Sequence, residues 1–281
     1  MDNVVFPATP TDYQPVLALP VQARKAWGIT YQEYDPPASL RPFVSCFWQM
    51  TSAEPLGAAV THRVVPDGCT DLVFDLASPD AHSAAAVVGV TTRPLLVSLH
   101  GRVNYFAARF HPGALPYFVP CWADRLADEV VPLASVARGP VGGLTTQLRT
   151  TSDPCERTAL LTAYLEQQSP RPRDNDLCPE TLRHILQCHG GVTVPELADR
   201  SWMSERQFRR VFGQWFGVGP KAFCRIIRFQ SLLRLMKHDP GSTVLDTVLA
   251  AGYHDQAHFI HEFRGFTGLS PAAFAGAVAF F

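Results

Sequence analysis

Two helix-start signals that lie close together constrain the C-terminal part of this chain more than any other feature. Thr193-Val-Pro-Glu196 has the T-x-x-E form of a capping box, and Ser204-Glu-Arg-Gln207 has the related S-x-x-Q form. A short helix is expected to follow the first signal and to stop near 200–203, and a second helix is expected to run from the second signal to Gly217. Two short helices joined by a tight turn predict a helix-turn-helix unit.

The second of these helices has one apolar face and one basic face. Its apolar residues recur at the period of an amphipathic helix and are Phe208, Val211, Phe212, Trp215 and Phe216. The opposite face carries Glu205, Arg206, Arg209, Arg210 and Gln214. A helix that enters a DNA groove has this pattern, and so does an ordinary helical hairpin with a solvated outer face.

A long helix is expected next, from Pro220 to about Asp239. Proline is favoured at the first helical position, and Pro240-Gly241 would stop the helix. A helix of about twenty residues spans about 30 Å, close to the ~34 Å between successive major grooves on one face of DNA. One chain could therefore place two recognition helices in neighbouring grooves.

The helix-turn-helix pattern then occurs a second time. A short helix is expected over 244–251, and Asp255 can cap a following helix that Gly268 closes. The inner face of this helix has Phe259, Phe263 and Phe266, and the outer face has Gln256, Ala257, His258 and His261. Because arginine can bind O6 and N7 of guanine together and this outer face has none near its start, the first unit is expected to dominate base discrimination.

The charge of the chain is unevenly distributed. The net charge of −1 averages a C-terminal part, from Leu177 onward, that has 11 Lys and Arg against 8 Asp and Glu. Between Trp202 and Lys237 eight basic side chains face only Glu205; they are Arg206, Arg209, Arg210, Lys221, Arg225, Arg228, Arg234 and Lys237. A local positive field of this kind favours a polyanionic partner.

The residues from Thr193 to Phe274 resemble the DNA-binding domain of the AraC/XylS transcriptional regulators, above all in the segment AGYHDQAHFIHEFRGFTGLSP from Ala251 to Pro271. A departure is Thr247-Val248, where the family usually has an Ile-Ala pair. The resemblance implies a sequence-specific transcription factor, more often an activator than a repressor, with double-stranded promoter or operator DNA and RNA polymerase as partners. It implies base contacts at Arg206, Arg209, Arg210, Gln256, Ala257, His258 and His261.

The N-terminal half is predicted to be rich in β-strands. Short apolar and β-branched runs, broken by Pro, Gly and Asp, extend from about Thr30 to Phe118 at a spacing of roughly ten residues. They are Phe43–Met50, His62–Val65, Thr70–Leu76, Val87–Val90, Leu95–Leu99 and Val103–Phe110. This spacing favours a small barrel or sandwich, which could be cupin-like, over a parallel sheet.

A polar linker predicts the domain boundaries. Residues 169–176, with two prolines and no apolar side chain, separate two helical patterns. The expected fold is α+β with two domains. They are a β-rich sensory or dimerisation domain with helices at its end (30–168) and an all-α double helix-turn-helix domain (177–281), and an N-terminal extension (1–29) precedes them.

Residues 120–168 are expected to be helical. Within them Asp153 can cap a helix that begins at Pro154 and has an apolar stripe. That stripe, made of Leu160, Leu161, Tyr164 and Leu165, fits core packing or the seam of a homodimer. The apolar tail 272–281 likewise either closes the helical domain, which is the favoured interpretation, or joins another subunit.

The segment Val64-Val-Pro-Asp-Gly-Cys-Thr-Asp-Leu-Val-Phe74, together with its flanking motifs over Tyr31–Val136, is similar to an uncharacterised β-rich domain often found ahead of this DNA-binding module. The resemblance implies a position in the protein and no particular ligand. A cavity for a small effector could be lined by Trp48, His62, Asp67, Cys69, Asp71, Arg109 and His111. The alternative is that Asp67-Gly68 is a plain turn with capping aspartates.

Catalysis and bound cofactors have little support in the sequence. The seven cysteines are scattered without a C-x-x-C motif, and the paired H-x-H of cupin enzymes is absent. No phosphate-binding or nucleophile motif occurs, so no cofactor or metal is expected and the chain is not expected to be an enzyme. Two alternatives stay open: a metal- or thiol-dependent β-barrel enzyme with a DNA-targeting module, and a ligand-independent transcription factor controlled by abundance or by a protein partner.

The expected location is the bacterial cytoplasm, with the protein associated with the nucleoid when DNA is bound. The start Met-Asp-Asn-Val-Val lacks the features of a secretory signal. The longest apolar tracts, 84–90 and 272–281, fall short of the roughly 20 residues that a membrane span requires.

Overall fold

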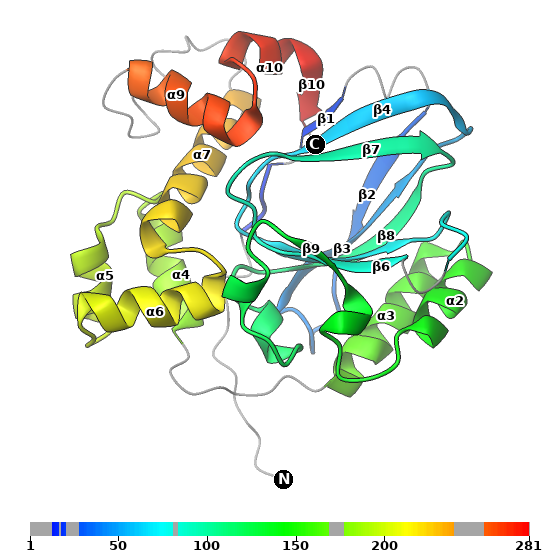
Figure 1. Ribbon diagram of the computed structural model, residues 1–281, viewed down its shortest axis with the longest axis horizontal. Coiled ribbons are helices and arrows are strands. Elements are labelled where there is room, and N and C mark those ends of the chain that lie inside the picture. Colours follow the sequence, from blue (N-terminus) through cyan, green and yellow to red (C-terminus); the bar gives the residue numbers. More distant parts are fainter. Residues whose placement is uncertain are drawn as a thin grey trace.

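The computed structural model describes residues 13–16, 18–20, 28–80, 84–168, 177–238 and 256–280. The expected fold class is confirmed: an N-terminal part built on β-sheet is followed by a helical C-terminal part (Figure 1). None of the helices in these ranges is both long and hydrophobic enough to cross a lipid bilayer.

The N-terminal part has a six-stranded sheet with the order β2-β3-β8-β5-β6-β9 and a separate pair, β4-β7. The strands are β2 Thr30–Tyr34, β3 Val44–Thr51, β4 Leu56–Val64, β5 Thr70–Asp75, β6 Ala85–Val88, β7 Leu95–Gly101, β8 Asn104–Phe110 and β9 Val130–Pro132. All neighbours pair antiparallel. The six runs predicted from the sequence all contain a strand, although β4 begins earlier than expected.

The six-stranded sheet is covered on both faces. Side chains alternate along a strand, so Phe47, Phe74 and Phe106 face the main hydrophobic core, whereas Trp48 and Ala107 belong to a second cluster on the other face. Helices α2 (Gly142–Thr150) and α3 (Pro154–Gln168) lie on the side of the sheet away from β4 and β7 (Figure 1). Strand β8 is consequently buried continuously over 106–110, as expected of a central strand with both faces covered.

The region before these helices differs from the prediction. Residues 120–141 were expected to be helical but contain β9 and two single-turn 3-10 helices, η2 (Ala123–Arg125) and η3 (Leu133–Ser135). Helix α3 does begin at Pro154, and the carboxylate of Asp153 accepts a hydrogen bond from Cys155 N at 2.9 Å. Leu161 and Leu165 of its apolar stripe are buried in the core.

The C-terminal part contains α4 (Cys178–Gln187), α5 (Val194–Arg200), α6 (Glu205–Phe216), α7 (Pro220–His238), α9 (Gln256–Thr267) and α10 (Pro271–Ala277). Thr193 and Glu196 form the predicted capping box, and Ser204 caps α6. The short helix expected over 244–251 and the cap Asp255 lie outside the described residues.

The two parts of the chain share one hydrophobic core. Trp215 of α6 packs against Tyr117 and Trp122, with ring centroids 5.0 and 5.5 Å away. Strand β1 (Ala18–Pro20) pairs antiparallel with β10 (Val278–Phe280), so segments from near the two ends of the chain lie side by side. Phe274 is buried 5.3 Å from the ring of Phe263, so this part of the apolar tail packs inside the helical part.

Candidate nucleic-acid interface and effector cavity

Helix α6 presents the basic face that its sequence predicts. The five apolar residues of its inner face are buried, and Gly217 ends the helix in the left-handed conformation with φ +81°. Arg206, Arg209 and Arg210 are therefore exposed on the opposite side. Arg209 forms an ion pair with Glu205 one turn earlier in the helix, whereas no carboxylate in the described part of the chain pairs with Arg206 or Arg210.

Helix α9 presents an outer face of different chemistry. Gln256, Ala257, His258 and His261 are exposed there. The inner residues Phe259, Phe263 and Phe266 are buried, as the spacing predicts. Figure 1 shows α6 and α9 near opposite ends of α7, to one side of the sheet. The 19 residues of α7 give it a length of ~28 Å.

An ion pair, a cation–π contact and aromatic packing attach α9 to α7. Arg225 of α7 forms an ion pair with Glu262 of α9, whose side chain is only 1% exposed. The Arg225 guanidinium also lies over the ring of Phe266, and Phe229 packs against Phe263 and Phe266. Arg225 belongs to the basic cluster between Trp202 and Lys237 in the sequence, but in the structure it helps to fix the position of α9. Arg228 is similarly engaged, because its guanidinium donates to the carbonyl of Gly190.

The N-terminal part contains a cavity of about 470 Å³ between the six-stranded sheet and the β4-β7 pair. Most of its lining is apolar: Met50, Val64, Val65, Val73, Ala84, Ala86, Val88, Leu95, Leu96, Val97 and Val130. The rest comes from Tyr31, Trp48, His62, Arg63, Asp71, Asp75, Ser98, Tyr105 and Arg109. A volume of this size and a mostly apolar wall are typical of small-molecule sites.

Four of the seven predicted effector residues line this cavity: Trp48, His62, Asp71 and Arg109. The other three, Asp67, Cys69 and His111, are buried but are not part of the lining. Burial raises the pKa of the Cys69 thiol well above its usual value, so this thiol stays protonated at neutral pH. A thiolate at Cys69 therefore has no support in the structure.

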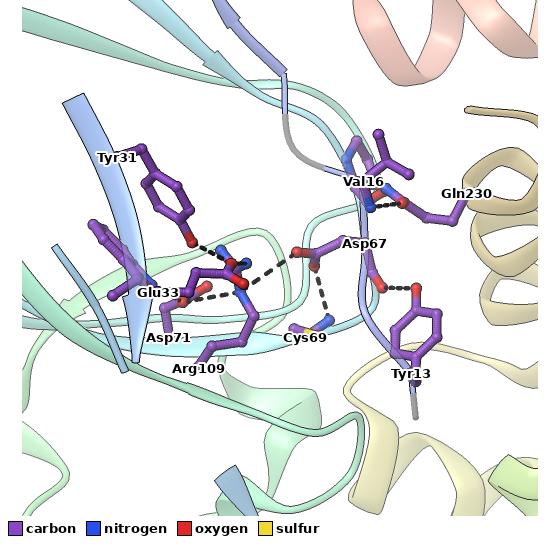
Figure 2. A network of polar contacts seen from close by, with 11 residues as sticks. Tyr13, Val16, Tyr31, Glu33, Asp67, Cys69, Asp71, Arg109 and Gln230 are labelled. Atoms are coloured by element: carbon purple, nitrogen blue, oxygen red, sulfur yellow. Dashed lines mark hydrogen bonds and ion pairs between the residues drawn. The ribbon is translucent and has the colours of Figure 1, made fainter. Parts of the chain in front are cut away.

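Arg109 is the centre of a buried polar network at one end of the cavity (Figure 2). It is 4% exposed and lies directly opposite Asp71 in the β5-β8 register. Its side-chain nitrogens lie 3.3 Å from Asp71, 3.7 Å from Glu33 and 3.9 Å from Asp67. Burial opposes the charge on Arg109, but Asp71, Tyr31 and Asp67 outweigh burial and raise its pKa, so the guanidinium remains charged.

The pKa of Asp67 is shifted upward and the pKa of His62 is shifted downward. Burial raises the pKa of Asp67 to about 6, although Arg109 acts against this shift. Burial lowers the pKa of His62 to about 4, so its imidazole is neutral at pH 7. Its buried Nδ1 has no hydrogen-bond partner among the described residues, which leaves one polar group of the cavity wall available to a ligand.

The network continues from Asp67 to the long helix of the C-terminal part (Figure 2). The Asp67 carbonyl accepts a hydrogen bond from the Tyr13 hydroxyl at 2.6 Å, and the Pro66 carbonyl accepts one from Gln230 Nε2 at 2.9 Å. Gln230 Oε1 in turn accepts from Val16 N at 2.8 Å. A second connection runs from β4, where Arg63 Nη1 donates to the carbonyl of Thr267 at the end of α9.

Sequence reasoning missed Tyr13, Val16 and Gln230. Only Gln230 had a local signal, because it is a polar residue at a position of α7 where the helical period requires burial. Gly68 shows how closely the parts approach: with φ +81°, an added Cβ there would lie 2.8 Å from the ring of Phe223.

Both parts of the chain match known protein-family profiles. Residues 197–277 match a profile described as "Helix-turn-helix domain", and these residues contain the end of α5 and all of α6, α7, α9 and α10. The chain carries an AraC-type helix-turn-helix domain. Residues 32–132 match a "Domain of unknown function (DUF6597)", and this range contains both sheets that enclose the cavity apart from the first two residues of β2.

One relative of the helical part has a regulatory name. An "Uncharacterized HTH-type transcriptional regulator" of Haemophilus influenzae is 35% identical over 86 residues, which are 31% of this chain and 28% of that protein. The match thus spans about a quarter of that relative's length. Two solved structures of ToxT from Vibrio cholerae are 9% and 10% identical over 81% of this chain, covering 97% and 96% of theirs, with TM-scores of 0.44 and 0.40.

Proposed function

We propose that this protein is a sequence-specific DNA-binding transcriptional regulator in which one chain inserts α6 and α9 into successive major grooves. The observation that carries the proposal is the pair of exposed recognition faces near the two ends of one helix of ~28 Å. That length is close to the ~34 Å repeat of the duplex.

Base discrimination is assigned mainly to Arg206 and Arg210. Both are exposed and have no carboxylate partner in the described ranges, so their guanidinium groups can reach guanine without breaking an ion pair. A well-formed bidentate contact with guanine is worth ~1–3 kcal/mol of discrimination. Arg209 would first have to leave Glu205, but an exposed pair of this kind contributes at most ~1 kcal/mol.

The contribution of α9 is expected to be smaller and different in kind. Gln256 can bind adenine with two hydrogen bonds, Ala257 can contact a thymine methyl group, and His258 and His261 can donate to base edges or phosphates. This helix therefore suits A·T-rich sequence or a particular DNA shape.

Selection of bound duplexes from a random pool tests the proposal. The wild-type chain should enrich one defined site, and Arg210→Ala should relax the preference at one or two base pairs and reduce the specific-to-random affinity ratio about tenfold. Arg93→Ala, which removes an exposed arginine of the N-terminal part, is the control and should leave the selected site unchanged. Enrichment of no sequence by the wild-type chain would refute the proposal.

A second part of the proposal concerns regulation. The cavity is proposed to bind a small effector, and the contacts of Pro66 and Asp67 with α7 and the N-terminal segment support a route from the cavity to the DNA-binding helices. Activation, contact with RNA polymerase and dimerisation stay predictions from the family resemblance.

A further inference from the structure

We infer that the cavity between the six-stranded sheet and the β4-β7 pair takes an organic cation, a ligand with an ammonium or guanidinium head and an apolar body. This inference rests on the proposed sensing role of the N-terminal part and adds the chemical class of the effector. It is carried by the charges and the ring systems at the Arg109 end of the cavity.

The buried charges at this end do not balance. Asp67 and Asp71 face one guanidinium, that of Arg109, and all three side chains are largely buried. Glu33 adds a third carboxylate, 3.7 Å from Arg109 Nη1. Its side chain is 41% exposed, so its charge is partly screened by solvent. An excess of buried negative charge is unfavourable unless a cation compensates it.

The remaining charged groups of the lining do not remove this excess. The guanidinium of Arg63 binds the end of α9, because its Nη1 donates to the Thr267 carbonyl at 2.6 Å. Asp75 accepts hydrogen bonds from the backbone of Ala77 and Ser78. These two opposite charges cancel, and His62 is neutral at pH 7.

Asp71 supplies an acceptor atom for the cation. Its Oδ1 accepts a hydrogen bond from Trp48 Nε1 at 2.7 Å and lies 3.3 Å from Arg109. Its Oδ2 has no donor among the residues that the structure describes, and the side chain lines the cavity. The rings of Trp48 and Tyr31, whose centroids are 5.7 Å apart, line the same end. A carboxylate beside aromatic rings is a favourable environment for an ammonium group.

The body of the ligand is assigned to the rest of the cavity. Val64, Val73, Leu95 and Val97 form an apolar wall there. An anionic head would face the carboxylate of Asp71 and is disfavoured. A neutral hydroxyl competes better, because Arg109 Nε and Nη1 have no hydrogen-bond acceptor among the described residues.

Calorimetric titration of the purified full chain with three probes of equal length tests the inference: hexylammonium, 1-hexanol and hexanoate, at pH 7.5 and constant ionic strength. Hexylammonium should bind at least tenfold more tightly than 1-hexanol, and hexanoate should bind most weakly. Equal or tighter binding of hexanoate or of 1-hexanol, or binding of none of the three at millimolar concentration, overturns the inference. This comparison uses only the wild-type chain, so it does not depend on a variant that folds.

A variant then assigns the site. Asp71→Asn should reduce hexylammonium affinity at least tenfold and leave 1-hexanol affinity within about twofold, whereas Asp124→Asn, an exposed carboxylate of η2, should change neither. Unchanged hexylammonium affinity in folded Asp71→Asn would remove Asp71 from the site and overturn the assignment. DNA binding by the same preparations separates the proposals: a chain that prefers hexylammonium but selects no DNA site refutes the regulator, and the reverse result refutes the cation.

Discussion

Gln230, in the middle of α7, is fully buried and donates a hydrogen bond from Nε2 to the carbonyl of Pro66, 164 residues earlier in the chain. The neighbouring residue Asp67 faces Arg109, which lines the cavity. Helix α7, which separates the two proposed recognition helices, is therefore in direct contact with a loop next to the proposed effector site.

Gln230→Leu is expected to destabilise the protein and to weaken regulation. It leaves the Pro66 carbonyl and Val16 N without partners, and each buried unsatisfied group costs ~1–3 kcal/mol. Chemical denaturation should show this loss, and the effect of a bound ligand on DNA affinity should shrink. Gln187→Leu, at an exposed position of α4, is the matched control and should change both quantities little. Equal stability of the two variants would refute the role of Gln230.

Arg225→Ala is expected to disturb α9 more than its exposed position suggests. The substitution removes the cation that is paired with the buried carboxylate of Glu262. Breaking a fully buried pair costs ~3–5 kcal/mol, and because Arg225 is 44% exposed we expect a smaller loss, ~1–3 kcal/mol. Arg183→Ala, which breaks an exposed pair with Glu180, should cost at most ~1 kcal/mol.

The double variant Arg225→Ala/Glu262→Gln distinguishes this explanation from a loss of surface charge. Removing the buried carboxylate should recover part of the stability lost in Arg225→Ala. If stability is not recovered, the ion pair is not what holds α9.

Asp67 is expected to make the protein less stable at neutral than at mildly acid pH. Its pKa is raised in the folded state to about 6. Between pH 4 and 6 the folded state therefore holds a proton that the unfolded state has lost, so this contribution to stability falls as pH rises and is lowest above pH 6. His62, with a pKa lowered to about 4, acts in the opposite direction.

The difference in unfolding free energy between the wild type and Asp67→Asn isolates the contribution of Asp67. Relative to the variant, the wild type should lose on the order of 2 kcal/mol between pH 4 and pH 7. A difference that is constant over this range would contradict the raised pKa.

Much of the helical part was predictable because its signals are local. The capping side chains of Thr193 and Ser204, the glycine at 217 and the proline at 220 each act on backbone within one turn, and the structure has the corresponding helix ends. Residues 120–141 were not predictable in the same way. Their 3-10 turns are only three residues long, and β9 exists through its pairing with β6.

The cavity was predictable only in part. Trp48, Asp71 and Arg109, which the sequence predicted as cavity residues, each lie in a predicted strand, and β3, β8 and β5 are neighbours in the sheet. The partners that connect the cavity to α7 carry no such signal, because the contacts of Gln230 with Val16 and Pro66 join residues 214 and 164 positions apart. The ion pair of Arg225 was not predictable for the same reason, since Glu262 is 37 residues away.

Hydroxyl-radical footprinting of the selected site with the full chain tests the central claim most directly. If α6 and α9 enter successive major grooves, one chain should protect two patches on one face of the duplex, ~10 base pairs apart centre to centre, and affinity should fall steeply with salt. Arg210→Ala should weaken protection of one patch more than the other. A single protected patch at saturating concentration of the wild-type chain would contradict the account.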